Sequence, residues 1–132
     1  MTTIYFVRHA HSTYTKEKRE RPLSEKGHCD AENVTHLLKD KHIDVVISSP
    51  YKRAIQTVQG IANTYKLSIQ TEEDLRERLL STEPVSNFND AMQNVWEDWG
   101  FAYEGGESND IAQRRAVICI QNILKNMKVR IL

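Results

Sequence analysis

The feature that most constrains this chain is a short apolar run that leads directly into a cation and an imidazole. Residues 4–7 are Ile, Tyr, Phe and Val, and Arg8 and His9 follow at once. A continuous apolar run of this length is typical of a strand buried on both faces of a parallel sheet. Ligands of open α/β sheets bind beyond the carboxyl ends of the strands. This strand would therefore place Arg8 and His9 where such folds carry out chemistry.

Strand-like and helix-like segments alternate along the rest of the chain. Apolar runs predict strands, and apolar residues at helical spacing predict helices between them. The expected strands are residues 4–7, 44–48, 67–70 and the opening of a fourth at 128–132. The expected helices begin at Ser24, after Pro50, near Ala91 and at Ser108, with Ser24 and Ser108 as the capping residues. This order predicts an α/β fold, a three-layer α/β/α arrangement around a mostly parallel central sheet. A length of 132 residues predicts a single domain over residues 1–132.

Composition excludes several classes of function. Lys and Arg number 18 and Asp and Glu also number 18, so no overall field favours nucleic acid or a membrane surface. No apolar run approaches the length of a membrane span, and the amino terminus lacks the layout of a signal peptide. The two cysteines, Cys29 and Cys119, fit a reduced protein of the cytoplasm. Because basic and acidic residues balance, any site for an anion must be a local group of cationic side chains.

Polar side chains follow three of the expected strands. Arg8 and His9 follow the first strand, Arg53 lies one turn into the helix after the second, and the third leads to Glu77. Guanidinium groups bind phosphate oxygens through paired hydrogen bonds, and a neutral imidazole can attack phosphorus. A carboxylic acid near a bound anion holds its proton and can give it to a leaving alkoxide. If these strand ends lie side by side, they build a pocket for phosphoryl chemistry.

Short motifs occur in a fixed order over residues 4–127. They are Arg-His-Ala at 8–10, Leu-Ser-x-x-Gly at 23–27, Ser-x-x-x-Arg-Ala-x-x-Thr at 49–57, Leu-x-Glu at 75–77 and Gly-Glu-Ser at 106–108. In this order they resemble the histidine phosphatase superfamily, which includes the cofactor-dependent phosphoglycerate mutases and many small phosphatases. The resemblance implies a phosphoglycerate mutase-like fold and an enzyme that works through phosphohistidine. Because mutases are usually longer, phosphatase activity is favoured over mutase activity.

The resemblance also implies roles for individual residues. His9 would be the nucleophile that becomes phosphohistidine, and Glu77 would be the acid and base. Arg8 and Arg53 would bind the phosphoryl group, with small polar residues near the substrate at Ser12 and Thr15. The implied ligand is a small phosphorylated substrate or inorganic phosphate, and the chemistry requires no metal or other cofactor.

Two departures from the family pattern bear on activity. Ala10 stands where the family has glycine, which requires only an ordinary backbone conformation. The family also has a second catalytic histidine, in a Ser-His-Gly-like motif after the long last helix. The sequence given ends at Leu132, and its other histidines are His11, His28, His36 and His42. The expectation is a domain truncated before that histidine, impaired in catalysis, with an open edge on the first strand that a second copy would cover in a homodimer.

Other interpretations remain open at this point. The chain could be a non-catalytic relative that binds a phosphorylated ligand. A metal hydrolase using His9 and His11 is disfavoured, because no Asp or His partners stand at metal-ligand spacing elsewhere. Without the resemblance, Glu77 and Arg53 would be assigned to the surface. The charge run at residues 16–21 is typical of a solvated surface segment.

Overall fold

The structure, a computed structural model, describes residues 1–82 and 85–130, with side chains up to Met127. The chain forms two compact units. The first is Met1–Arg76, and the second begins at Glu77. The prediction of a single domain over residues 1–132 stays a prediction.

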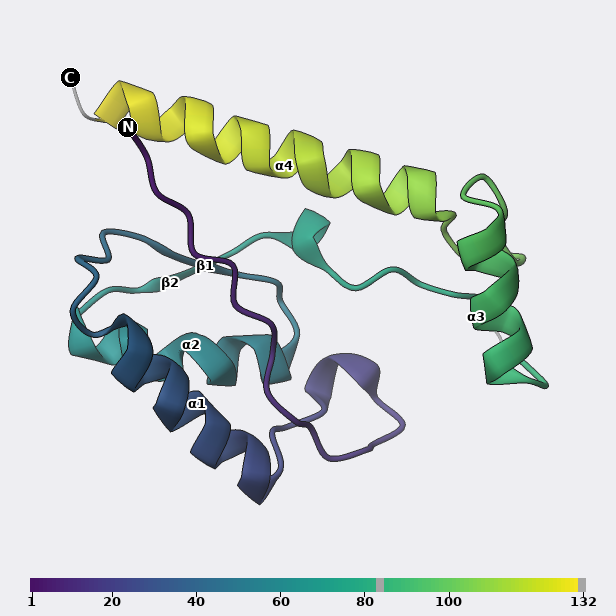
Figure 1. Ribbon diagram of the computed structural model, residues 1–132, viewed down its shortest axis with the longest axis horizontal. Coiled ribbons are helices and arrows are strands. Elements are labelled where there is room, and N and C mark those ends of the chain that lie inside the picture. Colours follow the sequence, from purple (N-terminus) through teal and green to yellow (C-terminus); the bar gives the residue numbers. More distant parts are fainter. Residues whose placement is uncertain (83–84, 131–132) are drawn as a thin grey trace. The chain divides into compact units, whose positions relative to one another are not determined.

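The first unit contains a parallel βαβ arrangement (Figure 1). Strand β1, Val46–Ser48, pairs in parallel with strand β2, Ile69–Thr71, and Val46 lies opposite Ile69. Helix α2, Lys52–Thr64, connects the two strands. Parallel neighbours need such a crossover, and its right-handed form is the rule in α/β folds. The prediction of an α/β fold with a parallel sheet is therefore confirmed.

The core of the first unit lies between this sheet and α2. Val46, Ile61 and Ala62 are buried in it, and partly buried apolar side chains surround them at Leu38, Ile43, Val58, Tyr65, Leu67 and Ile69. Helix α1, Glu25–Leu38, packs along α2. A Cβ at Gly60 would lie 2.2 Å from the Thr35 hydroxyl oxygen, so the glycine permits this close helix contact.

Residues 4–7 do not form the expected buried strand. They are extended, and the exposed fractions of Ile4, Tyr5 and Phe6 are 43%, 43% and 77%. A strand exists only where a neighbour accepts and donates its backbone hydrogen bonds. Within the described residues no strand lies beside this run, so its apolar character alone does not make it a strand. The prediction of a strand buried on both faces is wrong for this structure.

The second unit is built from two helices. Helix α3, Phe88–Glu97, begins after Asn87, whose side-chain oxygen accepts a hydrogen bond from the Asp90 backbone at 3.1 Å. Helix α4, Asn109–Arg130, begins after Ser108, whose hydroxyl accepts from the Ile111 backbone at 3.2 Å. The predicted cap at Ser108 is therefore confirmed.

Helix α4 continues past the point where a fourth strand was expected. Residues 128–130 are helical, so the prediction of a strand opening there is wrong, and residues 131–132 lie outside the described part. Extending an existing helix fixes one residue for each hydrogen bond gained, which easily overrides the weak β propensity of a few residues. None of the described helices is long and apolar enough to cross a membrane.

Candidate functional site

His9 lies in the first unit, on the extended segment ahead of α1. Its side chain is half-buried, and its Nδ1 lies 2.8 Å from the Ala10 carbonyl oxygen. With the proton on Nδ1, this contact is a hydrogen bond donated to the carbonyl, and Nε2 keeps its lone pair. A neutral imidazole held in this tautomer is the form that can act as a nucleophile.

The segment that carries His9 is tied to helix α2. The Ala10 backbone donates a hydrogen bond to the Thr57 hydroxyl at 3.0 Å. That hydroxyl donates in turn to the Arg53 carbonyl at 2.7 Å. Arg53 and Thr57 are four residues apart and so share one face of the helix. The motif at residues 49–57 thus supplies both a cation and the anchor for the segment after His9, and sequence reasoning had assigned no role to Thr57.

A second anchor holds the chain just beyond His9. The Ser24 hydroxyl accepts from the Gly27 backbone at 3.1 Å and lies 2.7 Å from Nδ1 of His11. The Ser24 backbone donates to the His11 carbonyl at 2.9 Å. A Cβ at Gly27 would lie 2.0 Å from that carbonyl oxygen, so the motif at residues 23–27 needs its glycine for close approach. The contact with Ser24 fixes the orientation of the His11 ring.

Arg53 is buried, and this overturns its assignment to the surface. Only 4% of the residue is exposed, and Nη1 donates to the Lys18 carbonyl at 2.9 Å. The guanidinium also lies 4.7 Å from the centre of the Tyr51 ring. Burying a cation costs free energy unless its surroundings compensate the charge. Arg8, in contrast, is exposed, and it has no hydrogen-bond or ion-pair partner within the described residues.

The other predicted site residues fall into two groups. Ser12 forms an isolated antiparallel bridge with Leu23, and the Thr15 hydroxyl donates to the Glu17 carbonyl at 3.1 Å. Both therefore belong to the loop that follows His9. Glu77 opens the second unit with an exposed side chain. The structure thus ties the segment after His9 to the helix that carries Arg53. The placement of Arg8, Arg53 and Glu77 around His9 stays a prediction.

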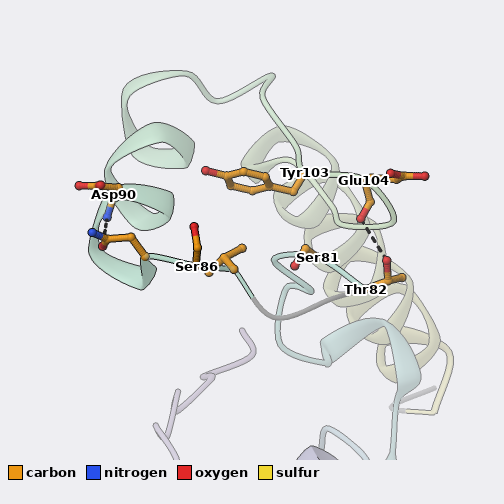
Figure 2. A pocket seen from close by; sticks show the side chains of 8 residues that line it. Ser81, Thr82, Ser86, Asp90, Tyr103 and Glu104 are labelled. Atoms are coloured by element: carbon orange, nitrogen blue, oxygen red, sulfur yellow. Dashed lines mark hydrogen bonds between the residues drawn. The ribbon is translucent and has the colours of Figure 1, made fainter.

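The second unit contains an open cavity of about 370 Å³ (Figure 2). Its described lining residues are Ser81, Thr82, Val85, Ser86, Asn87, Asp90, Tyr103 and Glu104. Hydroxyl groups and two carboxylates dominate this lining, and none of these residues is basic. A phosphate dianion would be repelled here, so the candidate phosphate site is the one around His9 and not this cavity.

Comparisons with known proteins identify the family of the chain. The profile of the histidine phosphatase superfamily (branch 1) matches residues 4–132. Phosphoserine phosphatase 1 of Hydrogenobacter thermophilus is 30% identical over 121 residues, which cover 82% of this chain and 57% of that protein. Phosphoglycerate mutase-like protein 4 of Arabidopsis thaliana is 37% identical over 84 residues, which cover 58% of this chain and 36% of that protein. The chain belongs to the histidine phosphatase superfamily, as the motifs indicated.

Solved structures show the same fold. The mycobacterial glucosyl-3-phosphoglycerate phosphatase in complex with inorganic phosphate aligns with a TM-score of 0.76 at 21% identity, over 89% of this chain and 60% of that chain. The alpha-ribazole phosphatase of Shigella flexneri aligns with a TM-score of 0.73 at 22% identity, over 92% of this chain and 67% of that chain. The fold is therefore phosphoglycerate mutase-like, as predicted.

Proposed function

We propose that this protein hydrolyses phosphomonoesters and that His9 accepts the phosphoryl group. The observation that carries the proposal is the hydrogen bond from the Ala10 backbone to Thr57, which ties the segment bearing Arg8 and His9 to the helix that carries the buried Arg53. Guanidinium groups bind phosphate oxygens through paired hydrogen bonds. Relatives named as phosphatases, and a solved relative that holds inorganic phosphate, support the same chemistry.

The reaction would proceed in two displacements. Nε2 of His9 attacks phosphorus, the N–P bond forms and the ester P–O bond breaks. Glu77 gives its proton to the leaving alkoxide, and Arg8 and Arg53 bind the phosphoryl oxygens. Water then attacks the phosphohistidine, Glu77 takes the proton from that water, and inorganic phosphate leaves. The Nδ1 proton shared with the Ala10 carbonyl disperses the positive charge on the phosphorylated ring.

The substrate is proposed to be a small phosphorylated molecule, with Ser12 and Thr15 close to it. The absence of a nucleic-acid partner and a location in the cytoplasm stay predictions. A homodimer also stays a prediction; the exposed Ile4, Tyr5 and Phe6 are the surface that a second copy would cover. Light scattering of the wild type and of Phe6→Ser tests it, and a monomer in both would exclude this surface.

Turnover by a polypeptide of residues 1–132 alone is proposed to be slow. The chain matches about half of the length of its curated relatives, and its five histidines all lie within the first 42 residues. The family places a second catalytic histidine after the last helix. Removing one preorganised group of this kind costs about 10²–10³ in rate. The alternative is a non-catalytic protein that binds phosphorylated ligands and forms no phosphohistidine.

Trapping the phosphoenzyme tests the proposal. The protein is mixed with p-nitrophenyl phosphate, quenched with base and digested, and phosphohistidine is located by mass spectrometry. We expect phosphate on His9, none in His9→Ala and normal labelling in the matched control His11→Ala. Phosphate on another residue would refute the role of His9. Binding of inorganic phosphate with no phosphohistidine would establish the non-catalytic alternative.

A further inference from the structure

The charge run at residues 16–21 is not the freely solvated segment that its composition indicates. The segment of residues 15–21, called here the charged strap, contains the 3₁₀ turn Lys18–Glu20. Arg21 Nε donates to the Thr15 carbonyl at 2.7 Å, which closes the strap on itself. Its middle packs against α2 of the same unit. The strap therefore has a defined place in the first unit.

Arg19 fastens the strap to the far end of the sheet. Its two terminal nitrogens contact the two carboxylate oxygens of Glu73, one of them at 3.1 Å. Glu73 begins the 3₁₀ turn Glu73–Leu75, which follows strand β2. The hydrogen bond to Glu73 is the main reason that the pKa of Arg19 lies above its usual value. The fork-to-fork geometry fixes the direction of the Arg19 side chain as well as its charge.

The same strap reaches Arg53 by two routes. The carbonyl of Lys18, the residue before Arg19, accepts the hydrogen bond from Arg53 Nη1 at 2.9 Å. The guanidinium carbons of Arg19 and Arg53 lie 5.4 Å and 4.7 Å from the centre of the one Tyr51 ring. The hydrogen bond to the Lys18 carbonyl fixes one edge of the Arg53 guanidinium, and the contact with the Tyr51 ring fixes its plane.

We propose that Arg19, held by Glu73, is a positioning residue for Arg53 and acts through the Lys18 carbonyl and the Tyr51 ring. The inference rests on the proposed function, in which the Arg53 guanidinium binds the phosphoryl group. A guanidinium whose plane is set in advance loses less freedom when it binds two phosphate oxygens. Breaking the Arg19–Glu73 pair would leave Arg53 present and charged but less well oriented.

The test uses the full chain and two measurements. The first is the ¹⁵N–¹H signal of Arg53 Nε, which reports restricted motion and the ring current of Tyr51 without any ligand. The second is the Kd for inorganic phosphate from titration at low salt. The variants are Arg19→Gln, Glu73→Gln and Arg19→Lys, and the matched control is Lys26→Gln, which breaks the exposed ion pair with Asp30 on α1.

We expect Arg19→Gln and Glu73→Gln to shift and broaden the Arg53 signal and to raise the Kd by about two- to fivefold, the range of exposed ion pairs. Arg19→Lys should recover part of both effects, and Lys26→Gln should show neither. High salt should reduce the difference between wild type and Glu73→Gln, because the pair is exposed.

Failure of this inference is distinguishable from failure of the proposed function. If phosphate binds and Arg53→Gln weakens that binding by about 10-fold or more, while Arg19→Gln behaves like Lys26→Gln in both measurements, the positioning role is refuted and the function stands. If the Arg53 signal responds to Arg19→Gln and Glu73→Gln but the wild type binds no phosphate, the positioning role stands and the function is refuted.

Discussion

The two units use close backbone contacts for different purposes. In the first unit, Gly27 lets α1 approach the His11 carbonyl, and that contact holds the segment just after His9. In the second unit, Gly106 lies against Leu80, where a Cβ would be 2.1 Å from the carbonyl oxygen. That contact holds only a loop ahead of α4. Both family motifs therefore use a glycine for close approach to a backbone carbonyl, but only the motif with Gly27 lies beside the predicted nucleophile.

Each unit has an arginine with little exposed surface, and the two arginines show the same contrast. In the first unit Arg53 donates to a backbone carbonyl, Lys18, and lies against an aromatic ring. In the second unit Arg115 donates to both carboxylate oxygens of Glu107, at 2.8 Å and 2.7 Å. A carboxylate neutralises Arg115. Arg53 lies on the helix that anchors the segment after His9, so we expect Arg53 to serve the anion site and Arg115 to serve stability.

The largest expected effect separates these two arginines. Arg53→Gln should weaken binding of inorganic phosphate by about 10- to 100-fold, because it removes charge-assisted hydrogen bonds to the anion. Arg115→Gln should leave the Kd for phosphate unchanged. It should instead lower the free energy of unfolding by about 2–3 kcal/mol, because Glu107 stays largely buried without that guanidinium. Phosphate titration and urea unfolding of both variants measure this, and equal losses of affinity would contradict the comparison.

The two glycines give the next largest effect. Gly27→Ala and Gly106→Ala each place a Cβ about 2 Å from a backbone carbonyl oxygen, so the backbone must shift. Each should lower the free energy of unfolding by about 1–3 kcal/mol, as overpacking does. Only Gly27→Ala should also weaken phosphate binding, since it displaces the segment next to His9. If Gly106→Ala weakens binding equally, the second unit takes part in holding the anion.

Thr57 and Asn109 compare two buried side-chain anchors. Thr57→Val keeps the shape of the side chain but removes the acceptor for the Ala10 backbone N–H, at a cost of about 1–2 kcal/mol. Thr57→Val should also lower the affinity for phosphate several-fold. Asn109→Ala removes the hydrogen bond to the Val95 carbonyl and should affect stability alone. Thr64→Val, on the exposed side of the same helix as Thr57, is the control, and its phosphate affinity should match that of the wild type.

Local signals in the sequence predicted the helices well. Ser24 and Ser108 were identified as caps and are caps, because a capping bond joins residues three apart and needs no distant partner. The expected strands at 44–48 and 67–70 are present in shorter form, at Val46–Ser48 and Ile69–Thr71. Both belong to a local βαβ unit, in which the crossover helix brings the strands together.

Features that depend on distant partners were not predictable in the same way. The run at 4–7 has strand-like residues, but no strand lies beside it in the part of the chain that the structure describes. The buried Arg53 donates to the Lys18 carbonyl in the strap, 35 residues away. Thr57 binds the Ala10 backbone across 47 residues. Composition carries no information about such contacts. The motifs named His9 and Arg53 as site residues, and that role stays a prediction, but the residues that hold their segments required the structure.

The smallest expected effect compares two helix caps. Ser24→Ala and Asn87→Ala each remove a side chain that accepts from the first turn of a helix, and each should cost about 1 kcal/mol. The Ser24 hydroxyl also contacts the His11 ring. A single hydrogen bond contributes about 1 kcal/mol or less, so Ser24→Ala should raise the Kd for phosphate only about twofold. Ser24→Thr, which keeps a hydroxyl, should restore both stability and affinity. Asn87→Ala should leave affinity unchanged, and a drop there as large as in Ser24→Ala would mean that the caps of both units serve the anion site equally.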